Sequence, residues 1–151
     1  MKGCRVIEWW ARVFLGCEGE GEQSYGALLQ RLVDASGAKT LMTPVNLQPA
    51  GAPLVLAKKV ERELAKEIHW GGPFAAEAVI LDTERLPELL DGGLEARAIL
   101  ARCSMIAIWQ SPDFEVLLLR HFASQKDDDP PLGRSIAALS DVWAGSGNKI
   151  F

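Results

Sequence analysis

Four short apolar segments alternate with longer stretches of helical periodicity, and this alternation constrains the fold more than any other feature of the chain. The apolar segments cover residues 11–17, 40–47, 78–82 and 104–109. A nearly uninterrupted apolar run is typical of a parallel strand that is covered on both faces. The order β-α-β-α-β-α-β-α therefore predicts an α/β fold, with a mostly parallel four-stranded sheet flanked by helices.

The segments between the strands carry their apolar residues on one helical face. From Tyr25 to Val33 the spacing is i, i+3, i+4, i+7 and i+8, and Ser36-Gly37 predicts the end of this helix, because glycine accepts left-handed backbone geometry. The next helix is expected to begin at Pro53, and residues 70–73 (WGGP) break its pattern. It should bury four apolar residues at i, i+4 spacing: Leu56, Val60, Leu64 and Ile68. Further helices are expected over about 86–101, 114–122 and 136–143.

Composition argues against several classes of protein. The formal charge of −4 gives no general attraction to nucleic acid, so such binding would need a local basic patch or a bridging metal. No apolar run approaches the roughly 18 residues of a membrane span, and no signal peptide is expected. Three cysteines without CxxC spacing argue against a disulfide scaffold or a thiolate zinc site. We expect a cytoplasmic protein with one main domain over residues 1–125. Residues 126–151 should form a weakly helical tail packed on that domain.

Acidic residues follow three of the four predicted strands. They are Glu18, Glu20 and Glu22 after the first, Asp82 and Glu84 at the third, and Asp113 and Glu115 after the fourth. Sites in open parallel sheets form outside the carboxyl ends of the strands, so these acids can share one site. Carboxylates suit Mg²⁺ or Mn²⁺ rather than zinc, and a cation would relieve their repulsion. The alternative is that each acid only complements the dipole of a helix start.

Three stretches of the chain resemble motifs of RloB-like proteins, which belong to the Toprim (topoisomerase–primase) group together with the OLD-type nucleases. Residues 17–25 (CEGEGEQSY) are similar to the opening CEGxTExxY signature. Residues 82–84 (DTE) stand in the place of the DxD motif, and residues 111–122 (SPDFEVLLLRHF) resemble the stretch NPCFExWLLxHF. Residues 51–57 (GAPLVLA) also resemble the family's segment after its second strand. The resemblance covers roughly residues 11–122 in the right order.

The resemblance implies a Mg²⁺-dependent nuclease, with a Toprim-like catalytic domain over residues 1–125 and Mn²⁺ as a possible substitute. By position, Glu18 matches a glutamate often assigned acid–base work, and Asp82 and Glu84 match the metal-binding acidic pair. Glu115 is expected as a further metal ligand. Three more residues are expected beside the metal ligands: Glu22, Asp113 and His121. Relatives of this kind often act in bacterial defence against phage, which implies the same role here.

The chain departs from the family pattern at five positions. Gly21 replaces the usual threonine, and Glu84 replaces the second aspartate with a side chain one methylene longer. In the third motif, Ser111 and Asp113 replace the asparagine and cysteine, and Leu117 replaces a tryptophan. These departures keep open a second hypothesis, in which the chain is a catalytically degenerate binding or regulatory subunit of a larger defence assembly. Since no ATPase motif is present, a partner ATPase or a homo-oligomer is the expected assembly.

Two further features have a structural and a functional interpretation. Lys58, Arg62 and Lys66 share a helix face that can contact a phosphate backbone, but interleaved glutamates favour a solvated face of mixed charge. We expect the three basic residues to contribute modestly to nucleic-acid binding. His121 lies on an apolar helix, where a hydrogen-bonded structural histidine is favoured over a phosphate contact.

Overall fold

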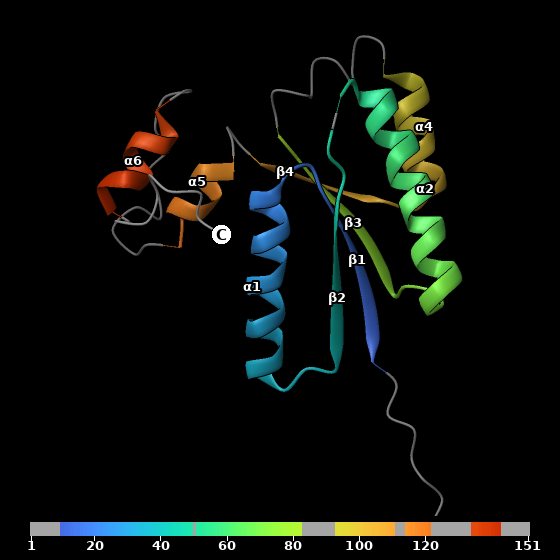
Figure 1. Ribbon diagram of the computed structural model, residues 1–151, viewed down its shortest axis with the longest axis horizontal. Coiled ribbons are helices and arrows are strands. Elements are labelled where there is room, and N and C mark those ends of the chain that lie inside the picture. Colours follow the sequence, from blue (N-terminus) through green and yellow to red (C-terminus); the bar gives the residue numbers. More distant parts are fainter. Residues whose placement is uncertain (1–9, 50, 83–92, 111–113, 122–133, 143–151) are drawn as a thin grey trace, which may run out of the picture.

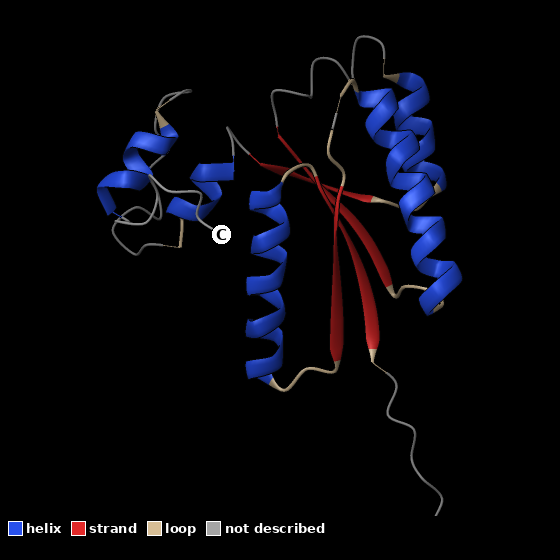
Figure 2. Cartoon of the chain, viewed as in Figure 1, coloured by secondary structure: helices blue, strands red, loops and turns tan. Residues whose placement is uncertain are grey.

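The computed structural model describes residues 10–49, 51–82, 93–110, 114–121 and 134–142. Within these ranges strands and helices alternate as predicted (Figure 1 and Figure 2). The strands are β1 (Ala11–Cys17), β2 (Thr40–Asn46), β3 (Ala76–Asp82) and β4 (Ile106–Gln110). The helices are α1 (Glu20–Ser36), α2 (Pro53–Gly71), α4 (Leu94–Arg102), α5 (Phe114–Leu119) and α6 (Ser135–Val142).

The four strands form one sheet in the order β2-β1-β3-β4, and every pairing is parallel. The expected parallel α/β sheet is therefore confirmed. Connections between parallel strands of one sheet are almost always right-handed. Because β2 and β3 lie on opposite sides of β1, the crossovers through α1 and α2 run in opposite directions and cover opposite faces. Figure 1 shows α1 on one face of the sheet, and α2 with α4 on the other.

Alternating side chains of the central strands fill the two layers between sheet and helices. Phe14, Val79 and Leu81 belong to the cluster beneath α2 and α4, where they pack with Val60 of α2 and Ile99 of α4. The other face is built from a smaller cluster of buried residues: Leu15, Cys17, Ala78 and Ile80. Both faces of β1 and β3 are covered, which explains why these two strands were recognisable as nearly continuous apolar runs.

Backbone conformation ends the two long helices where the sequence predicts. Gly37 follows α1 with φ +74°, and its N–H donates to the carbonyl of Asp34. Gly72 follows α2 with φ +82°. Both angles lie in the left-handed region that glycine occupies without a side-chain clash. Pro53 opens α2, as expected from its fixed φ and missing N–H.

Two residues of the predicted apolar stripes are exposed rather than buried. Leu32 of α1 is 55% exposed, and it lies one turn past Leu28 and Leu29, which pack against the cluster around α5. Ile68 is also exposed, because the last turn of α2 extends past the end of α4 (Figure 1). In both helices the row of apolar residues continues beyond the part of the protein that packs against it.

The two short C-terminal helices pack against α1. Tyr25 of α1 is buried in a cluster with Phe114 and Leu118 of α5 and Leu139 of α6. The tail predicted over residues 126–151 therefore includes a helix that packs on the main body. The first part of the helix expected over 86–101 lies outside the described residues, as do Phe122 and Trp143. Among the helices that the structure describes, none combines the length and apolar composition needed to cross a bilayer.

Removing the Phe14 side chain should destabilise the protein strongly. Phe14 has no exposed surface and makes an edge contact with Phe74 at a centroid separation of 5.6 Å. We expect Phe14→Ala to lower the free energy of unfolding in urea by about 3–5 kcal/mol, through lost burial and a residual cavity. The matched control is Leu32→Ala on exposed surface, which should change it by less than about 0.5 kcal/mol. Equal effects of the two substitutions would contradict the described core.

Candidate functional site

The carboxyl ends of β1 and β3 lie side by side at the point where the chain changes direction across the sheet. From β1 the chain crosses to β2 on one side, and it later returns to β3 on the other side. Such a switch point is where open α/β sheets bind their ligands. Cys17 is in register with Ile80, so Glu18 and Asp82 follow on neighbouring strands at one edge of the sheet. The backbone of both predicted site residues is therefore at this edge.

The buried Glu22 feels the charges of two other glutamates that come from separate elements. Glu22 of α1 is only 7% exposed, and burial is the largest cause of its raised pKa. The negative charges of Glu18 and Glu115 raise the pKa of Glu22 further. Glu18 is half-buried, and its Oε2 atom is shielded from solvent. The loop after β1, the first turn of α1 and the first turn of α5 thus contribute to one acidic cluster, formed by Glu18, Glu22 and Glu115.

Glu22 also has a structural role at the start of α1. It is the third residue of the helix after the N-cap Gly19, the position from which a glutamate reaches back to the N-cap N–H. The backbone N–H groups of Glu22 and Gly19 lower the pKa of Glu22 and partly offset the effect of burial. A Cβ atom at Gly19 would lie 2.9 Å from Oε2 of Glu22, so the glycine leaves room for the carboxylate. Glu20, in contrast, is exposed in the same turn.

Gly21, which departs from the resembling motif, allows α5 to approach α1 closely. A Cβ atom at Gly21 would lie 3.0 Å from Cε1 of Phe114. That separation is too short for the branched threonine of the motif without movement of the Phe114 ring. Phe114 opens α5 and directly precedes Glu115. The glycine therefore contributes to placing the Glu115 segment against the first turn of α1.

The predicted site is only partly within the residues that the structure describes. Glu84, Asp113 and the side chain of Asp82 lie outside them. Among the side chains that are described, no three or more His, Cys, Asp or Glu residues are grouped so that they could hold a metal ion. A metal centre at this edge would therefore need carboxylates of the β3 end. The oxygen donors of Glu18 and Glu115, and the repulsion that raises the pKa of Glu22, fit a hard divalent cation.

One neutral residue at this edge was not predicted from the sequence as part of the site. Gln110 is the last residue of β4 and lies in register with Asp82 of β3. Its side chain is 3% exposed, and its Nε2 and Oε1 atoms have no hydrogen-bond partner among the described residues. The available signal was a polar residue at the end of an apolar strand, immediately before the third motif.

The contacts of His121 favour its structural interpretation. The Nε2 atom of His121 lies 3.0 Å from the hydroxyl of Tyr25, and the two rings are 5.6 Å apart. Tyr25 in turn makes an edge contact with Phe114. His121 therefore helps to join the end of α5 to α1.

Cys17, the first residue of the resembling signature, is unsuited to nucleophilic chemistry. Burial and the nearby charge of Glu22 raise its pKa to about 12, so the thiol is neutral near physiological pH. The Sγ atom is 3.4 Å from the carbonyl oxygen of Leu15, to which it donates a weak hydrogen bond. The residue is part of the core beneath α1.

The basic face of α2 is occupied by surface ion pairs. Lys66 and Arg62 both approach Oε atoms of Glu63, at 2.9 Å and 3.0 Å. Lys58 lies 3.5 Å from Glu95 of α4. These contacts support the interpretation as a solvated face of mixed charge.

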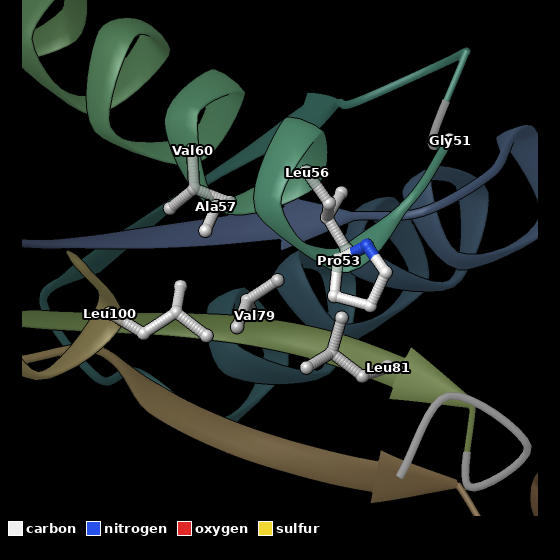
Figure 3. Close-up of a pocket in the computed structure, with 8 residues that line it drawn as sticks. All are labelled: Gly51, Pro53, Leu56, Ala57, Val60, Val79, Leu81 and Leu100. Carbon is white, nitrogen blue, oxygen red and sulfur yellow. The ribbon is translucent and has the colours of Figure 1, made fainter. Parts of the chain in front are cut away.

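A small cavity lies beneath α2 (Figure 3), and none of the three glutamates of the acidic cluster lines it. Its volume is about 10 Å³, close to the minimum for one water molecule. Apolar side chains of α2, α4 and β3 surround it, including Leu56, Val79 and Leu100. We therefore treat it as imperfect packing and not as a ligand site.

No protein-family model, curated protein or solved structure matches the chain. The acidic edge of the sheet and the resemblance of the motifs are the two observations that bear on function.

Replacing Glu22 with glutamine should stabilise the protein in a pH-dependent way. The fold raises the pKa of Glu22 above its ordinary value of 4.5, so folding disfavours the ionised form. This destabilisation is absent at a pH below the pKa that Glu22 has in the unfolded chain. It is fully developed at a pH above the pKa that Glu22 has in the folded protein. Glutamine keeps the reach to the N-cap without the charge. We expect Glu22→Gln to raise the thermal midpoint near neutral pH, and the difference to vanish as the pH falls below 4.5.

The matched control is Glu20→Gln, which removes an exposed first-turn charge and should lower the midpoint slightly near neutral pH. A Glu22→Gln effect that does not change with pH would contradict the electrostatic origin.

Proposed function

We propose that the chain is a Toprim-like, metal-dependent nuclease that hydrolyses phosphodiester bonds in DNA or RNA. The observation that carries this proposal is the adjacency of β1 and β3 at the switch point, where each strand leads into an acid of a resembling motif. The charges of Glu18 and Glu115, which help burial to raise the pKa of Glu22, support the same conclusion because a bound cation would offset them. The proposed setting is the bacterial cytoplasm, in defence against phage.

The proposed metal ligands are Glu18, Asp82, Glu84 and Glu115, with Mg²⁺ or Mn²⁺ as the ion. When bound, the ion would neutralise phosphate charge, polarise the phosphoryl oxygen and lower the pKa of a bound water. Glu18 is half-buried at the switch point, where its carboxylate would accept a proton. Glu22 would act beside the ligands by holding the first turn of α1 in place.

A second candidate function is a degenerate Toprim-like subunit that binds a partner, such as an ATPase or another copy of the chain. It is favoured by the departures from the resembling motifs at Glu84, Ser111 and Asp113. The use of Glu22 in the N-terminal turn of α1 also favours it, because that carboxylate then serves the helix.

Incubation with labelled DNA and RNA, in Mg²⁺ and then Mn²⁺, tests the nuclease directly. We expect cleavage by the wild type and at least about a hundredfold loss in Glu18→Ala and Asp82→Ala, the loss typical of a missing acid–base or metal-binding group. Glu84→Asp restores the motif and should keep activity. Glu20→Ala is the matched control, since Glu20 is an exposed acid in the same turn.

Circular dichroism should show that all four variants remain folded. Full activity of Asp82→Ala would contradict the mechanism. Absence of cleavage by the wild type, together with no thermal response to Mn²⁺, would favour the degenerate subunit.

The basic face of α2 should contribute little to substrate binding. Each phosphate contact steepens the log–log salt dependence of duplex binding by about 0.9. We expect the Lys58→Ala, Arg62→Ala, Lys66→Ala triple variant to flatten the slope by no more than about one such contact, because Glu63 and Glu95 already pair with these cations. Arg31→Ala on α1 is the control. An unchanged slope in the triple variant would show that the face is only solvated surface.

A further inference from the structure

The burial pattern of β4 is the reverse of what a hydrophobic edge strand would show. Ile106 and Ile108 are 58% and 42% exposed, whereas Gln110 on the same strand is 3% exposed. Neither amide atom of Gln110 has a hydrogen-bond partner among the described residues. A buried amide with both groups unsatisfied is costly, and native proteins rarely keep one without a reason.

The position of Gln110 indicates what that reason is. It ends β4 at the carboxyl edge of the sheet, opposite Asp82 of the neighbouring strand. The short α5, which carries Glu115 in its first turn, follows after a few residues. The backbone of Gln110 therefore lies between the end of β3 and the start of α5, which carry acids of the proposed site, and its amide is buried from water.

We propose that Gln110 is a substrate-contacting residue, whose side-chain N–H donates to a phosphate oxygen bound at this edge. The inference rests on the proposed nuclease function and adds a residue to its site. The side chains of the acidic cluster are hydrogen-bond acceptors when ionised. They therefore repel a phosphate and cannot donate a hydrogen bond to it. The N–H groups of Gly19 and Glu22 already act on the Glu22 carboxylate. A neutral amide can donate a hydrogen bond to the phosphate. Unlike a lysine or arginine, it carries no positive charge that would compete with the cation for the carboxylates.

Two substitutions separate this role from alternatives. Gln110→Leu removes both amide groups, and Gln110→Glu keeps the shape and one oxygen but replaces the donor with an acceptor. The probe is a labelled oligonucleotide, titrated with Ca²⁺ in place of Mg²⁺ to slow its cleavage. Thermal midpoints are measured without metal and with Mn²⁺.

For Gln110→Leu we expect a metal-free midpoint equal to or above that of the wild type, because an unsatisfied buried amide is removed. Affinity for the oligonucleotide should fall by about tenfold or more, the value of a hydrogen bond to a charged group. Gln110→Glu should lose at least as much affinity. Both variants should keep the Mn²⁺ shift. Gln110→Met provides a second apolar variant should the leucine not fit.

The matched control is Gln30→Leu, because Gln30 is a glutamine whose amide is fully used. Its Nε2 donates to Oδ1 of Asp34 at 2.7 Å, and its Oε1 accepts from the N–H of Met42 at 2.6 Å. We expect this substitution to lower the midpoint and to leave oligonucleotide affinity unchanged, the opposite of the Gln110→Leu result.

Three results from the Gln110 variants would overturn the inference. Oligonucleotide affinity of Gln110→Leu within twofold of the wild type would exclude the contact. Affinity lost in Gln110→Leu but kept in Gln110→Glu would assign the role to the oxygen, as a cation ligand. A lowered metal-free midpoint in both apolar variants would show a structural amide. A wild type that binds neither Mn²⁺ nor the oligonucleotide would instead contradict the proposed function, and the inference with it.

Discussion

The pairing of β1 with β2 on one side and β3 on the other determines how the rest of the molecule is arranged. A parallel strand in this position needs cover on both faces, and right-handed crossovers supply it by placing α1 on one face and α2 on the other. The same pairing creates the switch point, because the chain leaves β1 in one direction and returns in the other. Fold and candidate site therefore have one common origin.

The acidic cluster shows how the fold tolerates charges that repel one another. Burial and the charges of Glu18 and Glu115 disfavour the ionised form of Glu22, while backbone N–H groups at the start of α1 partly compensate. Unfavourable interactions such as those of the ionised Glu22 carboxylate are typical of functional sites, where a bound ligand can offset them. The buried amide of Gln110 has the same character, since its hydrogen-bonding groups have no described protein partner.

Close packing between α1 and α5 connects the acidic cluster to the C-terminal helices. Gly21 leaves the space that the Phe114 ring occupies, and Tyr25 joins Phe114 and His121 one turn further along α1. A departure from the resembling motif at Gly21 is thus matched by the position of an aromatic ring from the third motif. The two motifs are far apart in sequence, and they meet both in this aromatic packing and in the effect of Glu115 on Glu22.

Local patterns in the sequence were sufficient to determine the strands, the helix ends at Gly37 and Gly72, and the acids at the carboxyl ends of β1 and β3. Each of these depends on a few neighbouring residues, through apolar runs or through glycine at a left-handed position. Only the tertiary structure decided that β3 pairs with β1, that Glu115 acts on Glu22, and that Gln110 is buried while Ile106 and Ile108 are exposed. Strand order and burial depend on which distant segments meet, and no local pattern contains that information.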